Sequence, residues 1–333
     1  MKKKGEKKIV MIALRHNIIL APYTVYKIGG PARFFAEARN EQEMKEALDF
    51  AAKNQAAIFI LGAGSNILVS DKGFDGLAIH IIGGELRING PEVTVDAGIM
   101  MPRLAIETAK AGLSGLEWGT GVPGTAGGAV RGNAGCFGGE MKDVIESVEV
   151  LDFLNAKRFT LNARECQFGY RESIFKKHPE WIILSAVLKL KQEDPARTAE
   201  LLEVIRQKSA ERIGEQPIGE SSAGSIFKGV PLSEEILEKL GNRIPWWHRK
   251  HENSSWVFEN RRGFISAGFF IEMAGLKGWR VGNAVVSPKH ANFIINPGNA
   301  KAEDILTLIS IIKDTCMRKF GVILEEEIQY VGF

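Results

Sequence analysis

Apolar positions recur at helical spacing in four segments of the chain. In residues 41–56 they fall at i, i+3, i+4 and i+7, at Met44, Ala47, Leu48 and Ala51, which predicts an amphipathic helix. The same period predicts helices over 102–112, 196–213 and 301–321. In the last segment acidic residues come first, basic residues come late, and Gly321 follows. That order complements the helix dipole and favours a left-handed stop at Gly321.

Short apolar runs between these segments predict β-strands. They cover 57–61, 67–70, 76–82, 93–98, 147–153 and 181–190, and a closing strand covers 322–333. Helices and strands are mixed without strict βαβ alternation, so the order favours an α+β fold. No internal repeat is visible. The polar, proline-containing stretch 192–197 predicts a domain boundary.

Composition narrows the class of protein. A chain of 333 residues with 45% hydrophobic and 25% charged residues is typical of roughly two soluble domains. A net charge of +3 gives no reason to expect a nucleic-acid or membrane partner. Three scattered cysteines argue against a disulfide framework or a zinc site, and fit a reducing cytoplasm. The basic start is followed by an apolar run too short for a signal peptide, so we expect a solvated tail leading into the first strand.

Two glycine-rich segments carry the strongest chemical signal. The first, "GAGSN" at 62–66, follows a predicted strand, and the second spans 119–140. A Rossmann fingerprint is excluded, because its third glycine would fall at Ile67 and no helix pattern opens there. Such segments expose backbone N–H groups that can hold a pyrophosphate without a basic side chain. The alternative is a set of tight turns with no ligand.

Seven segments together resemble the UDP-N-acetylenolpyruvoylglucosamine reductase family. The resemblance runs from about Leu20 to the C-terminus, in the family's order. It rests on "LAPYTVYKIGGPA", "LGAGSNILVSDKGFDG", "GTGVPGTAGGAVRGNAGCFGGE", "FGYRESIFK", "SAGSIFK", "MAGLKGWRVGNAVVSPKHANFIIN" and "LEEEIQYVG".

The resemblance implies an α+β architecture with two domains. An FAD-binding domain of the vanillyl-alcohol-oxidase (PCMH) type would cover 20–195. An α+β substrate-binding domain would cover 196–333, with an insertion at about 229–262. The family binds FAD non-covalently. Its cofactor contacts correspond to Gly62, Ala63, Gly64, Ser65, Asn66, Gly121, Val122, Pro123, Gly124, Thr125, Gly132, Asn133, Ala134 and Gly135.

The activity implied is the NADPH-linked reduction of UDP-N-acetylglucosamine enolpyruvate to UDP-N-acetylmuramate, a precursor of peptidoglycan. Hydride passes from flavin N5 to C3 of the substrate, and C2 then takes a proton. Hydride addition pushes negative charge into the enolpyruvyl carboxylate, so a cation at that carboxylate and an acid near C2 are needed. We also expect a cytoplasmic monomer without a metal, acting on a small nucleotide-sugar substrate.

Three residues match the family's catalytic positions. Arg171 corresponds to the arginine that binds the carboxylate, Ser225 to the proton donor, and Glu327 to the catalytic glutamate, whose carboxyl could stay protonated if buried. Each also has an ordinary structural interpretation. Arg171 could form a surface ion pair with Glu172 or Glu165, Ser225 could be only a turn residue, and the acidic run 325–327 could face solvent. Strand alternation alone does not separate Glu325 from Glu327.

Three further residues are weaker candidates. Tyr170 would hydrogen-bond the substrate or pack as a core aromatic, and Lys228 would meet a phosphate or lie on the surface. His290 resembles a catalytic acid by type, but a structural or substrate-lining role is favoured.

The chain also departs from the family. Gly229 stands where the family usually has Asn, and Val285 where it usually has Gln; both family positions help to hold the nucleotide sugar. The insertion carries Trp246, Trp247 and Trp256, and predicts a lid or a packed excursion rather than a nucleic-acid contact. These departures keep two alternatives open: an FAD-linked oxidase or dehydrogenase for another small substrate, and a non-catalytic paralogue that binds FAD or a nucleotide sugar.

Overall fold

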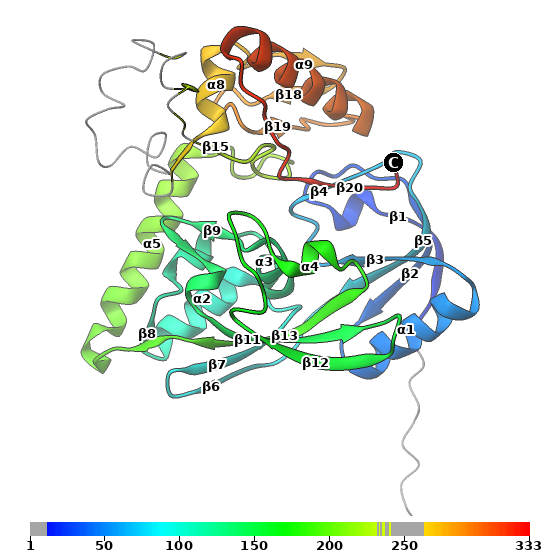
Figure 1. Ribbon diagram of the computed structural model, residues 1–333, viewed down its shortest axis with the longest axis vertical. Coiled ribbons are helices and arrows are strands. Elements are labelled where there is room, and N and C mark those ends of the chain that lie inside the picture. Colours follow the sequence, from blue (N-terminus) through cyan, green and yellow to red (C-terminus); the bar gives the residue numbers. More distant parts are fainter. Residues whose placement is uncertain (1–11, 232, 234, 237–239, 241–262) are drawn as a thin grey trace, which may run out of the picture.

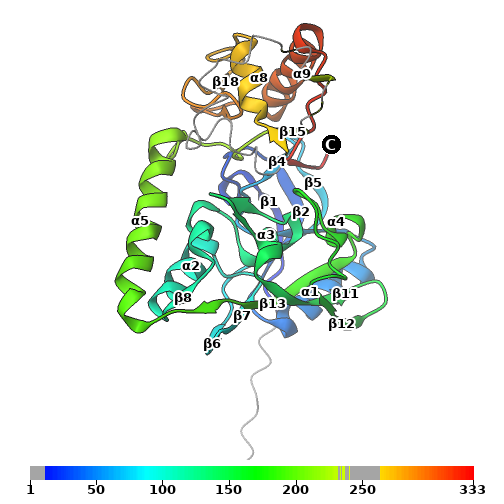
Figure 2. The same ribbon diagram turned by 60° about the vertical axis from the view of Figure 1, so that its left-hand side comes forward.

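The structure is a computed structural model that describes residues 12–231, 233, 235, 236, 240 and 263–333. The described chain forms two lobes, one above the other in Figure 1. The lower lobe contains two sheets with their helices, and the upper lobe is built around two helices, α8 and α9. The long helix α5 rises along one side of the lower lobe towards the upper lobe, as the turned view of Figure 2 shows.

The first sheet of the lower lobe is mixed, with strand order β1-β2-β5-β3. Its strands are β1 (Arg15–Ile19), β2 (Pro31–Ala38), β3 (Ala57–Leu61) and β5 (Phe74–Ile81). Helix α1 (Glu41–Lys53) packs on this sheet through the predicted apolar stripe, with Met44, Ala47 and Ala51 buried. Asn40 caps the helix by accepting the N–H of Glu43 at 2.9 Å. The predictions for this helix and for β3 are confirmed.

The second sheet is antiparallel throughout, with order β12-β11-β13-β7-β6. Its strands are β6 (Leu86–Asn89), β7 (Glu92–Asp96), β11 (Ile145–Asp152), β12 (Lys157–Asn162) and β13 (Trp181–Lys189). Helix α2 (Met101–Lys110) packs against α5 (Thr198–Glu215) through a small apolar cluster of Ala105, Ala109, Leu201 and Ile205. Both helices were predicted from their periodicity.

Several short elements lie between the longer helices and strands of the lower lobe. They are α3 (Ala126–Gly132), α4 (Ile174–Lys177), β4 (Ile67–Val69), β8 (Leu113–Ser114), β9 (Gly135–Cys136), β10 (Gly139–Glu140), β14 (Lys191–Gln192) and 3-10 turns at Ala21–Tyr23, Glu117–Gly121, Met141–Asp143 and Pro195–Arg197. The stretch proposed as a domain boundary, 192–197, is the connection from β14 to α5.

The upper lobe is built on an apolar core, to which Leu68 of β4 in the lower lobe also contributes. The upper lobe comprises α8 (Ala267–Met273), α9 (Ala302–Phe320) and the strands β17 (Arg280–Val281), β18 (Ala284–Val286) and β19 (Ile294–Ile295). Phe270 on α8 and Ile305 on α9 are fully buried in that core. Gly321 ends α9 at φ 66°, so the predicted left-handed stop is confirmed.

The closing strand is much shorter than the predicted 322–333. Only β20 (Gln329–Val331) is a strand, and it pairs in parallel with β4 in the lower lobe. The preceding residues follow the upper lobe instead, because Val322, Leu324 and Ile328 are buried in its core. The chain therefore crosses from the upper to the lower lobe at residues 325–329 (Figure 1).

The tryptophan-rich insertion falls mostly on residues 232, 234, 237–239 and 241–262, which lie outside the described residues. Its two ends are described. β15 (Val230–Pro231) pairs with β16 (Phe264–Ile265) in an antiparallel bridge.

Candidate active site

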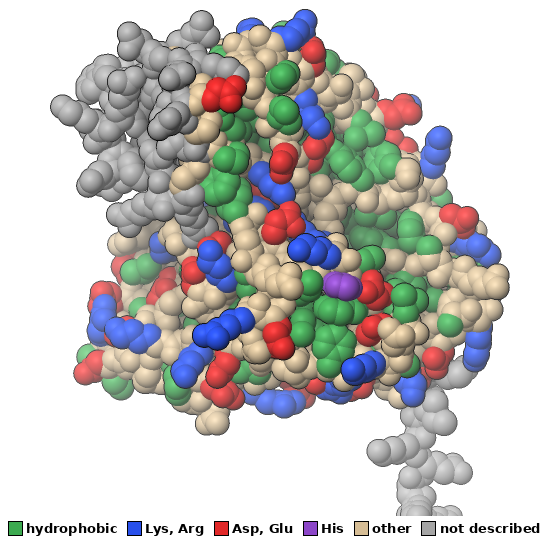
Figure 3. All heavy atoms as spheres, viewed as in Figure 1, with side chains coloured by type: hydrophobic (Ala, Val, Ile, Leu, Met, Phe, Trp, Pro, Cys, Tyr) green, Lys and Arg blue, Asp and Glu red, His purple; other side chains and the backbone are tan. Residues whose placement is uncertain are grey.

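A cavity of about 850 Å³ lies between the two lobes. It is within the size range of ligand pockets in proteins, at the upper end. Its lining is made by some residues of the segments 58–67, 121–138, 170–183 and 211–229, and by Ile81, Ala97, Ser266, Ala267, His290, Asn292, Phe293, Glu327 and Gln329. Acidic and basic side chains both gather along the junction of the lobes in Figure 3, so this face presents charges of both signs.

The two predicted glycine segments meet in this cavity. All residues of 62–66 and of 121–125 line it. A Cβ at Gly62 would lie 2.7 Å from Thr125 Oγ1, and one at Gly124 would lie 3.3 Å from Ser65 Oγ. Only glycine allows the two segments to approach so closely. The surface that they form together is poor in side chains and rich in backbone N–H groups, as a pyrophosphate site requires.

The second segment is more regular than the sequence indicated. Its middle forms the helix α3, capped by Thr125, whose side chain accepts the N–H of Gly128 at 3.4 Å. Gly132 lines the cavity, and a Cβ there would meet no described atom within 4 Å. Some of these glycines therefore open space for a ligand, while others allow protein segments to pack.

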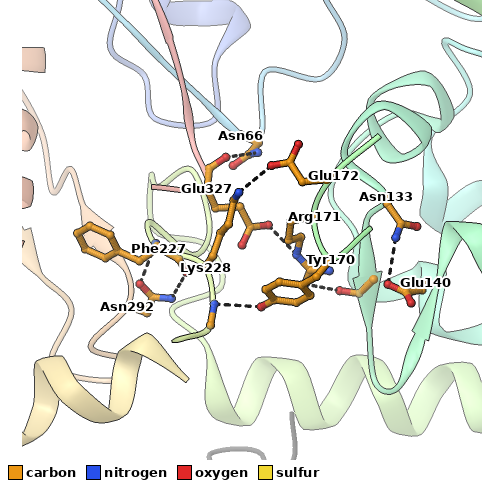
Figure 4. A network of polar contacts seen from close by, with 12 residues as sticks. Asn66, Asn133, Glu140, Tyr170, Arg171, Glu172, Phe227, Lys228, Asn292 and Glu327 are labelled. Atoms are coloured by element: carbon orange, nitrogen blue, oxygen red, sulfur yellow. Dashed lines mark hydrogen bonds and ion pairs between the residues drawn. The ribbon is translucent and has the colours of Figure 1, made fainter. Parts of the chain in front are cut away.

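Asn133 differs from its neighbours Ala134 and Gly135, which line the cavity. Its side chain is fully buried and its amide donates to Glu140 Oε2 at 3.1 Å and to the Gly169 carbonyl at 2.8 Å. Asn133 therefore connects the glycine segment to the segment that carries Arg171. Figure 4 shows its hydrogen bond to Glu140.

Arg171 lies on a tight turn that directs its guanidinium into the cavity. Its backbone is left-handed at φ 54°, and Gly169 and Glu172 exchange both backbone hydrogen bonds across the turn. The Nε atom lies 2.9 Å from Glu327 Oε1, and Nη2 donates to the Gly135 carbonyl at 2.9 Å. The guanidinium thus joins three segments that are distant in the sequence.

The structure separates the three acids of 325–327. Glu325 has a side chain 74% exposed, 3.6 Å from Lys228 Nζ, and Glu326 binds Lys313 at 2.8 Å. Glu327 is only 20% exposed, lines the cavity and pairs with Arg171. Its carbonyl also accepts the side-chain amide of Asn66 at 3.1 Å, which links it to the first glycine segment (Figure 4). At 2.9 Å the Arg171 guanidinium and the Glu327 carboxyl group are within the range of an ion pair.

Ser225 lines the same cavity, and the residue after it is hydrogen-bonded to the backbone of Glu327. Ser225 follows Gly224, which is left-handed at φ 76°. The next residue, Ile226, accepts the N–H of Glu327 at 2.7 Å. Asn292 then fixes the segment, because its side chain accepts the N–H of Phe227 at 3.0 Å and donates to the Phe227 carbonyl at 2.8 Å.

Tyr170 and Lys228 differ in their positions. Tyr170 lines the cavity, stacks on Phe264 with ring centroids 4.0 Å apart, and accepts the N–H of Gly229 at 3.0 Å. Lys228 is not among the described residues that line the cavity, and its Nζ lies 2.7 Å from Glu172. Val285 is also outside that lining, buried in β18.

Two cavity residues were missed by the sequence analysis. Lys176 donates from Nζ to the Arg171 carbonyl at 2.5 Å, and burial lowers the pKa of Lys176. Arg131 projects from α3 and donates to Gln329 Oε1 at 2.6 Å. Neither residue follows a strand or forms a recognisable spacing with the predicted site, so no local pattern identifies it.

His290 also lines the cavity. Burial lowers the pKa of His290 to about 4, and its Nδ1 accepts the N–H of Asn292 at 3.2 Å. A neutral imidazole is therefore the favoured form, in agreement with a structural or lining role rather than that of an acid.

No group of three or more metal-binding side chains occurs within the described ranges. None of the helices in that part of the chain has the length and apolar content needed to cross a bilayer.

Comparison with known families matched two models. Residues 32–161 match a model described as an FAD binding domain, and residues 216–331 match the C-terminal domain of UDP-N-acetylenolpyruvoylglucosamine reductase. The α+β architecture with an FAD-binding domain and a second, substrate-type domain is therefore confirmed.

Individual relatives match over nearly the whole chain. A UDP-N-acetylenolpyruvoylglucosamine reductase from Caldicellulosiruptor bescii is 37% identical over 94% of this chain and 89% of its own length. One from Clostridioides difficile is 35% identical over 92% of this chain and 90% of its own. A crystal structure of the Thermus caldophilus reductase covers 96% of this chain and 100% of its own, with 33% identity and a TM-score of 0.72.

Proposed function

The chain belongs to the UDP-N-acetylenolpyruvoylglucosamine reductase family of oxidoreductases, and on that premise we propose that it reduces UDP-N-acetylglucosamine enolpyruvate with NADPH. The product would be UDP-N-acetylmuramate, a peptidoglycan precursor. The observation that carries the proposal is the convergence of Arg171, Ser225 and Glu327 on a cavity that the two glycine segments also line.

The cavity fits FAD. The surface made by 62–66 and 121–125 offers backbone N–H groups for the pyrophosphate, and the open space beside Gly132 leaves room for a flat ring. Bound FAD would accept hydride from NADPH and deliver it to C3 of the substrate. We therefore assign the cofactor to residues Gly62, Ala63, Gly64, Ser65, Asn66, Gly121, Val122, Pro123, Gly124, Thr125, Gly132, Ala134 and Gly135.

Arg171 would bind the enolpyruvyl carboxylate. Its Nε is fixed by Glu327 and its Nη2 by Gly135, so the orientation of the planar guanidinium is set before substrate arrives. Hydride addition at C3 places negative charge on the substrate carboxylate, and a guanidinium already oriented there stabilises that charge without reorganisation. Glu327 acts chiefly by holding Arg171.

Ser225 would donate the proton to C2. It lines the cavity in the segment whose next residue, Ile226, is hydrogen-bonded to Glu327, so its hydroxyl and the Arg171–Glu327 pair serve the same region. Tyr170 contributes the wall beside Arg171, with its hydroxyl held by Gly229. Lys228 is better explained as a partner of Glu172 than as a substrate contact.

A steady-state assay tests the proposal. NADPH consumption should require the enolpyruvyl nucleotide, and mass spectrometry should find one molecule of the reduced nucleotide per NADPH consumed. An FAD-linked oxidase would be favoured instead if the protein oxidised NADPH or another small substrate and passed all of the electrons to oxygen. Bound FAD without any turnover would favour the binding paralogue.

A further inference from the structure

Arg171 brings no net charge to the proposed carboxylate site. Its guanidinium is already paired with the carboxylate of Glu327 at 2.9 Å, and both side chains are mostly buried. An anionic substrate group that approaches this pair meets one positive and one negative charge of equal size. Recognition of a carboxylate in a partly desolvated cavity therefore calls for a second cation close by.

Arg131 is hydrogen-bonded to the segments that carry the two members of this ion pair. Its carbonyl accepts the hydroxyl of Ser173 at 2.6 Å, which ties it to the segment of Arg171. Its Nη1 donates to Gln329 Oε1 at 2.6 Å, which ties it to the segment of Glu327. The side chain is partly buried and lines the same cavity.

The charge of Arg131 is not compensated by an ion pair within the described part of the chain. The hydrogen-bond partner of its side chain there, Gln329, is neutral. Glu172 attracts Arg131 only at longer range, and that carboxylate is already engaged by Lys228 at 2.7 Å and Lys176 at 3.6 Å. Burial lowers the pKa of Arg131, as expected for a cation that is desolvated without a carboxylate partner.

We propose that Arg131 is the second carboxylate-binding residue of the site and supplies the net positive charge that selects the enolpyruvyl group. This inference rests on the proposed function and adds to it a residue from α3. Arg171 fixes the orientation of the carboxylate, and Arg131 supplies the charge that holds it. The other uncompensated arginine in the lining, Arg212, is directed towards the Gly121 carbonyl and Gln216 on the α5 side.

Equilibrium binding to the oxidised holoenzyme tests the proposal without turnover. Calorimetry would compare UDP-N-acetylglucosamine enolpyruvate with UDP-N-acetylglucosamine, which lacks the carboxylate. Arg131→Met should weaken binding of the enolpyruvyl nucleotide roughly 10-fold to 100-fold, the range of a charge-assisted hydrogen bond. Binding of UDP-N-acetylglucosamine should change by less than about twofold.

Matched variants guard against a loss of folding. Arg131→Lys should recover most of the affinity, because it keeps the charge. Arg131→Gln keeps a polar partner for Gln329 without the charge, and should behave like Arg131→Met even if the methionine variant is unstable. Arg103→Met removes an exposed arginine on α2 and should change neither affinity.

Four results would overturn the inference. They are equal weakening of both nucleotides, no change in either, no recovery with lysine, and loss of bound FAD from Arg131→Met, which would assign Arg131 to the cofactor. Failure of the proposed function can be told apart from failure of this inference. In that case the wild-type protein itself would bind the two nucleotides equally.

Discussion

Arg171 and Glu327 come from distant parts of the chain, yet the Nε of one lies 2.9 Å from a carboxylate oxygen of the other. The pair forms where the closing segment crosses from the upper lobe to the lower lobe. The backbone of Glu327 is held from both sides, by Ile226 above and by the side chain of Asn66 below. The ion pair therefore links the turn that carries Arg171 to the segment that crosses between the two lobes.

Replacing Glu327 tests the role of that ion pair. Glu327→Gln keeps the shape but removes the charge that fixes Arg171, so reoxidation of reduced flavin by the enolpyruvyl nucleotide should slow roughly 100-fold. Stopped-flow absorbance measures this step separately from flavin reduction by NADPH, which should change little. Glu325→Gln is the matched control, since that side chain is 74% exposed and lies towards Lys228. If Glu325→Gln gave the larger defect, the assignment of Glu327 would be wrong.

Ser225→Ala should separate the two halves of the reaction more sharply. Loss of a positioned general acid costs typically 10²-fold to 10⁴-fold, so reoxidation by the enolpyruvyl nucleotide should slow by about that factor. Flavin reduction by NADPH needs no proton from this hydroxyl and should keep its rate. Equal slowing of both half-reactions would contradict the role of proton donor.

Gly62→Ala tests whether the glycine segments must touch. The added Cβ would lie 2.7 Å from Thr125 Oγ1, and displacement of that oxygen would also break the cap on α3. Overpacking of this kind costs about 1–3 kcal/mol, so FAD affinity, measured by fluorescence titration of the apoprotein, should fall roughly 5-fold to 150-fold.

Gly214→Ala is the control for that variant. Gly214 lies in α5, outside the cavity lining, and a Cβ there meets no described atom within 4 Å. It should keep FAD affinity and gain up to about 1 kcal/mol in unfolding free energy. Unchanged FAD affinity in Gly62→Ala would mean that the two segments do not form one cofactor site.

His290 predicts a dependence of stability on pH. Its folded-state pKa of about 4 lies below the ordinary value of 6.5, because burial disfavours the charged imidazole. The unfolded chain therefore binds the extra proton first, and stability is lost as pH falls from about 6.5 to about 4. His290→Asn should remove up to about 3 kcal/mol of that loss.

Urea unfolding midpoints at pH 7 and pH 4.5 measure the effect. The control is His16→Gln, which replaces an exposed histidine and should leave the pH dependence as in the wild type. If His290→Asn kept the full loss between those two pH values, His290 would not be the group responsible.

The sequence predicted most of the helices and strands whose formation depends on a local pattern of residues. Helices α1, α2, α5 and α9 were visible from their apolar period, and the stop at Gly321 from its place after a basic turn. The closing strand was overestimated because Leu324 and Ile328 look like strand positions, whereas they pack into the upper core.

The site was predictable only where local sequence carries the signal. The glycine segments, Arg171 and Glu327 were identified from their motifs, whereas the ion pair between Arg171 and Glu327 was not, since strand alternation does not separate Glu325 from Glu327. Arg131 and Lys176 were invisible, because only folding brings α3 and α4 beside the same cavity.

An absorbance scan of the purified protein tests the central claim most directly. The account predicts a yellow protein whose visible band of oxidised flavin bleaches with NADPH under anaerobic conditions and returns when UDP-N-acetylglucosamine enolpyruvate is added. A band that fails to bleach with NADPH, or that stays bleached after the enolpyruvyl nucleotide is added, would contradict it.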